Sequence, residues 1–89
     1  MRIIVCNLQM FSNEQTIQVI DTEHGLELTK KVEIDSLPSA ISFLAKKYEI
    51  DTVKLIGANN EYGLAWADEI QTSHVSHYGK NYNLNVEVL

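Results

Sequence analysis

The chain has 89 residues, of which 45% are hydrophobic and 21% are charged, as expected for a single soluble globular domain. Its 7 basic and 12 acidic side chains give a formal net charge of -5, which weighs against binding to nucleic acid or to anionic membranes. The single Cys6 excludes an internal disulfide framework, and the apolar run at residues 3–6 is too short for a signal peptide or a membrane span. We therefore expect a cytoplasmic protein in which Cys6 is a buried, unreactive thiol.

Three strands are predicted in the first part of the chain. Residues 2–8, "RIIVCNL", form a continuous β-branched run, which predicts a central strand covered on both faces. Residues 16–21 form a second run. Residues 26–34 alternate, which predicts a half-exposed edge strand with Lys30 as the one interruption of its apolar face. The short polar turns between these runs favour an antiparallel meander.

Two helices and two further strands follow. Residues 35–50 have helical spacing, with Asp35 or Ser36 as candidate caps, and lead into a strand at 52–57 that should run parallel to the first strand. Residues 60–79 return to helical spacing and end at a glycine. The apolar stripe predicted for this second helix consists of Tyr62, Trp66 and Ile70. Residues 83–89 alternate as an edge strand should.

These elements predict an α/β fold, β-β-β-α-β-α-β, with one mixed five-stranded sheet in the order 3-2-1-4-5 and one domain spanning residues 1–89. This succession resembles the ribonuclease H-like fold, the core shared by ribonucleases H, Holliday-junction resolvases and each half of the actin-like ATPases. Catalytic members carry an aspartate after the first apolar run, in a D-x-G pattern. In the matching stretch "IIVCNLQ", Asn7 stands at the aspartate position and Gln9 at the glycine position.

The other motifs of that family are also incomplete here. Resolvases place a carboxylate at the end of the fourth strand, where this chain has Gly57, Ala58 and Asn59, with Glu61 one turn later. Their last acidic residues lie on a helix beyond the fifth strand, and neither that helix nor the phosphate-binding D-x-G turn of the ATPases has a counterpart. The resemblance therefore implies a pseudoenzyme with no catalytic residues, no metal and no cofactor.

A candidate ligand site lies at the carboxyl ends of the first and fourth strands, which should be neighbours in this sheet order. It would consist of Asn7, Gln9, Asn59, Asn60 and Glu61. The alternative interpretation needs no ligand: Asn59 or Asn60 caps the second helix, and Glu61 complements the helix dipole.

Two further patterns favour ordinary surface roles. His74 and His77, near Asp68 and Glu69, lack the three or four converging ligands of a metal site, so we expect surface or partly buried histidines near a helix end. The lysine pairs at 30–31 and 46–47 have no accompanying aromatic ladder, which disfavours nucleic-acid binding.

Two functional hypotheses remain. The first is a non-catalytic interaction module that binds itself or another protein, such as a small phage or mobile-element accessory protein. Its interface, most simply that of a homodimer, would be the terminal strand with Leu84, Val86 and Val88 or the helix beside it. The alternative is a monomer whose edge is protected by twist or by the loop at 79–83. The second is a metal-dependent nuclease or Holliday-junction resolvase relative that uses Glu61 with Asp21 or Glu23.

Overall fold

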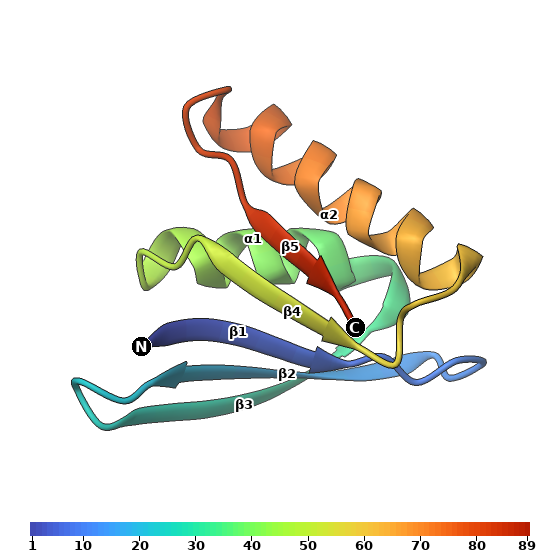
Figure 1. The fold of residues 1–89 in the computed structure, drawn as a ribbon, viewed down its shortest axis with the longest axis horizontal. Coiled ribbons are helices and arrows are strands. Elements are labelled where there is room, and N and C mark those ends of the chain that lie inside the picture. The colour runs from blue at the N-terminus through green and yellow to red at the C-terminus, as the bar shows by residue number, and fades with distance from the viewer.

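The structure is a computed structural model that describes residues 1–89. Its elements follow the predicted order, with one added 3₁₀ turn: β1 (Arg2–Asn7), β2 (Glu14–Asp21), β3 (Leu26–Glu33), η1 (Ile34–Ser36), α1 (Leu37–Lys47), β4 (Thr52–Ile56), α2 (Glu61–Tyr78) and β5 (Asn85–Val88). The five strands form one sheet in the order β3-β2-β1-β4-β5 (Figure 1). The β1–β2 and β2–β3 pairs are antiparallel, and the β1–β4 and β4–β5 pairs are parallel. The mixed sheet, its strand order and the antiparallel meander are confirmed.

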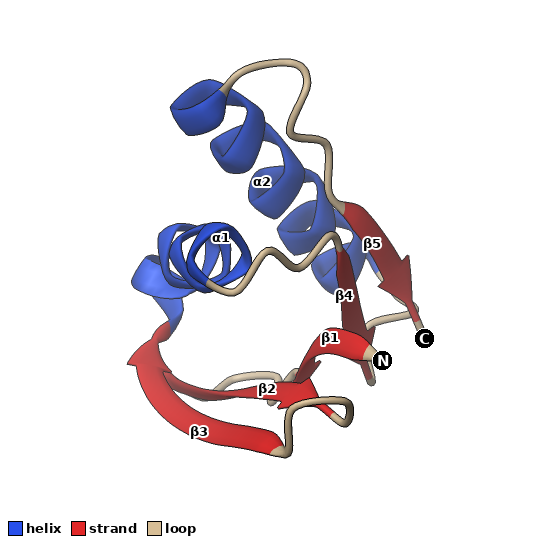
Figure 2. Cartoon of the chain, turned by 90° about the vertical axis from the view of Figure 1, so that its left-hand side faces the viewer, coloured by secondary structure: helices blue, strands red, loops and turns tan.

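Both helices lie on the same face of the sheet, so the prediction that β1 is covered on both faces is wrong (Figure 2). Ile4 and Cys6 are fully buried against the helices, whereas the alternate residues Ile3 and Val5 lie on the uncovered face. Ile3 and Val5 are nevertheless only 8% and 9% exposed. Their cross-strand neighbours explain this, because Val5 lies between Gln18 on β2 and Lys54 on β4, and the aliphatic parts of long neighbours shield a central strand.

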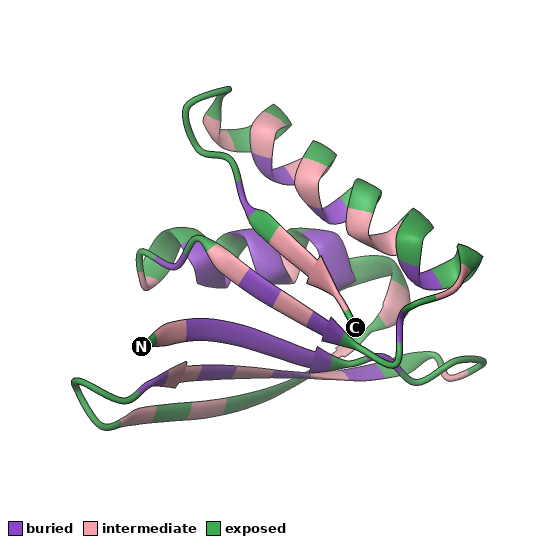
Figure 3. Ribbon diagram, viewed as in Figure 1, coloured by how far each residue is buried: buried purple, intermediate pink, exposed green.

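The core fills the space between the sheet and the two helices (Figure 3). On α1, Ile41, Leu44 and Ala45 are buried as the spacing predicts, and Pro38 lies in the first turn. Ser36 is the N-cap residue of α1, but its side chain makes no capping hydrogen bond, and Asp35 lies in η1 instead. The helix is therefore stabilised by burial of its apolar stripe rather than by a polar cap.

The buried stripe of α2 differs from the predicted one. Gly63, Ile70 and His74 are its buried residues, whereas Tyr62 is 38% exposed and Trp66 is half-buried. Gly63 explains the rotation, because a Cβ added there would lie 2.0 Å from the backbone oxygen of Ala58. The first turn of α2 thus approaches the backbone of Ala58, in the turn that follows β4, through a glycine. Since successive helix residues are about 100° apart, Tyr62 is turned toward the surface, and its predicted core position is wrong.

Candidate functional site

The carboxyl ends of β1 and β4 lie side by side, as predicted. Asn7 is in register with Ile56, and the Leu8 N–H donates to the Ile56 carbonyl at 2.9 Å. The chain then turns through Gly57, which has a φ of 72°, and enters α2 at Asn60. The Asn60 side-chain oxygen accepts a hydrogen bond from the Gly63 N–H at 2.8 Å. The capping interpretation is therefore confirmed for Asn60, and Glu61 occupies the first turn, where its charge favours the helix dipole.

The five predicted ligand residues share this end of the sheet but not one surface. Asn7 alternates with the fully buried Cys6, so its side chain lies on the uncovered face, whereas α2 begins on the helical face. Gln9 is held through its backbone, which exchanges two hydrogen bonds of 2.8 Å with the Gln15 side chain, and its own side chain is exposed. None of the three hollows on the protein surface is lined by any of the five residues. Ligand binding by this group stays a prediction.

Gln15 is a structural residue that the sequence pattern did not reveal. It is fully buried, and its amide also donates to the Ser12 carbonyl at 3.1 Å, so one side chain closes the loop between β1 and β2. Phe11 lies in this closed loop with a φ of 65° and is 98% exposed. Strand alternation was the available signal, because it places the polar Gln15 on the same face of β2 as the buried Ile17 and Val19.

Several large apolar side chains are exposed around the same end of the molecule, and we call them the apolar end surface. The β1–β2 loop, the β4–α2 turn and Leu89 lie together there (Figure 1), and their proximity is confirmed by the Asn60–Met10 contact of 3.6 Å and the Ala58–Leu89 hydrogen bond of 2.9 Å. Its members come from both faces of the sheet at this end and are Met10, Phe11, Ile56, Leu64 and Leu89, which are 38–98% exposed. Clustered exposure of this kind is typical of protein-contact surfaces.

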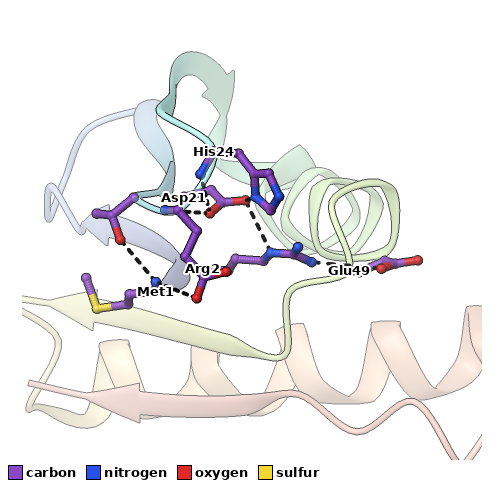
Figure 4. Close-up of polar contacts among 7 residues, drawn as sticks. Met1, Arg2, Asp21, His24 and Glu49 are labelled. Atoms are coloured by element: carbon purple, nitrogen blue, oxygen red, sulfur yellow. Dashed lines mark hydrogen bonds and ion pairs between the residues drawn. The ribbon is translucent and has the colours of Figure 1, made fainter.

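A polar cluster around Asp21 occupies the opposite end of β1 (Figure 4). One Asp21 carboxylate oxygen lies 2.7 Å from His24 Nδ1 and 3.2 Å from Arg2 Nε, and the other accepts from the backbone N–H groups of Glu23 and His24. Arg2 also reaches Glu49 at 3.9 Å. Burial by itself would raise the pKa of Asp21, but the hydrogen bonds from His24 and the charges of His24 and Arg2 hold it below its usual value.

The Asp21 cluster contains the one group of three side chains close enough to hold a metal ion, Asp21, Glu23 and His24, whose ligand atoms lie within 4.8 Å of one another. Both Asp21 oxygens already have partners, and the Arg2 guanidinium places a positive charge beside them. The geometry is that of a structural ion pair that fixes the β2–β3 turn to the start of β1. Asp21 pairs with Arg2 while Glu61 follows β4 at the other end of β1, so the structure does not bring Glu61 together with Asp21 or Glu23.

The two histidines of α2 have different surroundings. His77 is exposed, and its Nδ1 lies 2.8 Å from the Ser73 carbonyl oxygen. His74 is only 3% exposed, so the prediction of a surface or partly buried residue is wrong for it. Its Nδ1 lies 2.8 Å from the hydroxyl of Ser42 on α1, a partner separated by 32 positions that helix periodicity cannot reveal.

β5 is an edge strand, as predicted, and is hydrogen-bonded to β4 alone. The Asn85 N–H donates to Asp51 at 2.7 Å and the Leu89 N–H to Leu55 at 2.8 Å. Because alternate residues of a strand direct their N–H groups to opposite sides, those of Val86 and Val88 point to the free edge. Leu84 is buried and both valines are half-buried against the core, so Val86 and Val88 present their backbone, not their side chains, at this edge.

Comparison of the chain with protein-family models, with curated proteins and with solved structures found no match. Neither helix combines the length and the apolar character needed to cross a membrane.

Proposed function

We propose that this chain is a non-catalytic interaction module with ribonuclease H-like topology, and that it forms a homodimer through the free edge of β5. The observation that carries the proposal is the contrast between the two edges of the sheet. The β3 edge bears four exposed charged side chains, Glu27, Lys30, Lys31 and Glu33, and Lys30 lies on the helical face of the sheet. Charges and inward-pointing lysines of this kind discourage strand pairing. The β5 edge has one charged side chain, Glu87, and no proline.

The free amides of β5 select one arrangement of the dimer. The Leu84 N–H is already bound to the Gln71 side chain at 2.9 Å, which leaves Val86 and Val88 as donors. Antiparallel pairing centred on Glu87 places Val86 of each copy opposite Val88 of the other copy. The two valines of each such pair then exchange backbone hydrogen bonds. The two sheets become one continuous sheet of ten strands, twice the five of one chain.

This arrangement makes a second, independent prediction about charge. The two Glu87 side chains meet across the symmetry axis on the uncovered face, with Lys54 as the neighbour of each on β4. Like charges directly opposite each other weaken strand pairing by up to about 1 kcal/mol. Replacing Glu87 by glutamine should therefore tighten the dimer by up to about fivefold at low salt.

Sedimentation equilibrium at micromolar concentration tests the proposal. The wild type should have twice the 10.1 kDa mass of one chain, and Val86→Pro should be a folded monomer because it removes an edge N–H that β4 does not use. Val86→Thr is the matched control, since it keeps the N–H and a β-branched side chain. A wild-type monomer would end the proposal. If Val86→Pro remains a dimer and Phe11→Ser dissociates it, the contact lies on the apolar end surface instead.

The non-catalytic part of the proposal needs its own assay. With Asn7 in place of a carboxylate, the purified protein should not cleave branched or hybrid nucleic acid in magnesium or manganese. A metal-dependent cleavage activity that disappears in Glu61→Gln would show instead that the chain is an active nuclease.

A further inference from the structure

The largest hollow of the molecule lies between the C-terminal end of α1, the start of β4 and the α2–β5 loop. Its volume is about 480 Å³, which is within the range of small-molecule sites. Ala45 and Ile50 supply apolar wall, and the loop contributes Asn81, Tyr82 and Asn83. His74 of α2 also lines it.

His74 presents a hydrogen-bond donor to this hollow. The Ser42 hydroxyl is 2% exposed and has the His74 Nδ1 as its one hydrogen-bond partner, at 2.8 Å. A buried hydroxyl needs an acceptor, so Ser42 donates to Nδ1, and the neutral imidazole then carries its proton on Nε2. Nε2 has no partner within the protein. Every fully enclosed side-chain polar atom of the structure has a hydrogen-bond partner, so Nε2, which has none, must border open space. The hollow that His74 lines is that space.

Charged groups of both signs line the hollow. Lys46 lies on the His74 side, with its Nζ 3.9 Å from the centre of the Tyr82 ring. Burial, and then the positive charges of Lys46 and His77, lower the pKa of His74, so at neutral pH this side offers an ammonium group and an uncharged N–H donor. Glu49 and Asp51 contribute carboxylates to the same lining.

We propose that this hollow binds a small zwitterion of the amino-acid class. The carboxylate of the ligand accepts from His74 Nε2–H and pairs with Lys46, and its ammonium group faces Asp51 and Glu49. The two carboxylates and the net charge of -5 disfavour a polyanion such as a nucleotide. The three potential metal ligands that do lie together in this protein are at the Asp21 cluster, so the hollow is not a preformed metal site.

Titration of the ¹⁵N-labelled protein, followed by amide NMR, tests this site. The probes are single free amino acids, with acetate, ethylamine and inorganic phosphate as partial mimics. At least one amino acid should cause saturable shifts confined to residues 45–51 and 81–84 and to the surroundings of His74. Acetate and ethylamine should bind more weakly by about tenfold or more, the loss expected for one charge-assisted contact.

Two pairs of nearby residues of the same type, two lysines of α1 and two histidines of α2, provide matched controls. Lys46→Met should weaken binding by about tenfold or more. Lys47→Met should leave binding unchanged, because Lys47 lies near Phe43 and Tyr48 instead. His74→Gln should abolish the shifts and His77→Gln should not; if His74→Gln fails to fold, the lysine pair decides. The proposal is overturned if no amino acid shows saturable binding, or if Lys47→Met weakens binding as much as Lys46→Met. It is also overturned if acetate or phosphate binds as well as the amino acids, because the hollow would then hold an adventitious ion only.

Discussion

Replacing Gly63 by alanine tests how α2 is joined to the sheet, because two physical effects of opposite sign meet at this residue. An alanine within a helix is up to about 1 kcal/mol more favourable than a glycine, and Gly63 is the third residue of α2, so helix propensity by itself predicts a more stable protein. In the structure, however, the added Cβ would lie 2.0 Å from the Ala58 oxygen and 2.5 Å from its carbonyl carbon. These atoms belong to the backbone and cannot rotate away.

The clash should outweigh the gain in propensity. Overpacking that moves backbone typically costs about 1–3 kcal/mol and occasionally more, and here the helix must lift away from the end of β4 and strain the Asn60 cap. We therefore expect a net loss of about 1–2 kcal/mol in the free energy of unfolding. For a domain of this size, that loss lowers the melting temperature by roughly 4–16 °C.

Urea denaturation followed by circular dichroism measures the effect, with Ala65→Gly as the control. Ala65 is exposed on the same helix, so its replacement should show the ordinary propensity cost of about 1 kcal/mol without any packing term. If Gly63→Ala proved as stable as the wild type or more stable, the close approach of α2 to Ala58 would be refuted.

Three further predictions concern single residues. Trp66→Ala should lower the free energy of unfolding by about 2 kcal/mol, roughly half the value for a fully buried tryptophan, because Trp66 is half-buried against the core. An unchanged midpoint in urea denaturation would show that Trp66 makes no such contact. Asp21→Asn should reduce stability at neutral pH. Because the folded-state pKa of Asp21 is lowered, its contribution to stability is present above the unfolded-state pKa and is lost as the pH falls through the folded-state pKa. The stabilities of wild type and variant should therefore converge in acid, and a difference that stays constant with pH would contradict this. Burial raises the pKa of the Cys6 thiol to about 11, so the native protein should resist a thiol reagent at pH 8 and the unfolded protein should react at once, whereas rapid native labelling would place Cys6 at the surface.

The sheet was predictable because its signals are local. The apolar run of β1 marks a central strand, and the helix before β4 makes that strand parallel to β1. What covers each face was not predictable in the same way. Ile3 and Val5 are as hydrophobic as Ile4, and only the path of the two helices decides which of these residues they cover.

The surroundings of the predicted site show a similar division. The proximity of Asn7 to the start of α2 followed from strand order, but strand alternation places the Asn7 side chain on the face that α2 does not cover. The stripe on α2 was misplaced because Gly63, which has no side chain to contribute to a hydrophobic pattern, is the buried residue of the first turn and packs against the backbone of Ala58. The contact between Ser42 and His74 joins two helices, and no spacing within either helix predicts it.

Amide hydrogen exchange at Val86 and Val88 tests the proposed dimer most directly, because these N–H groups have no partner within the chain. If β5 pairs with β5 of a second copy, both amides should be protected at high protein concentration and lose protection on dilution, while the Asn85 amide, which is bound to Asp51, changes little. Rapid exchange of both amides at every concentration at which the protein remains folded would contradict the claim that this edge is the interface.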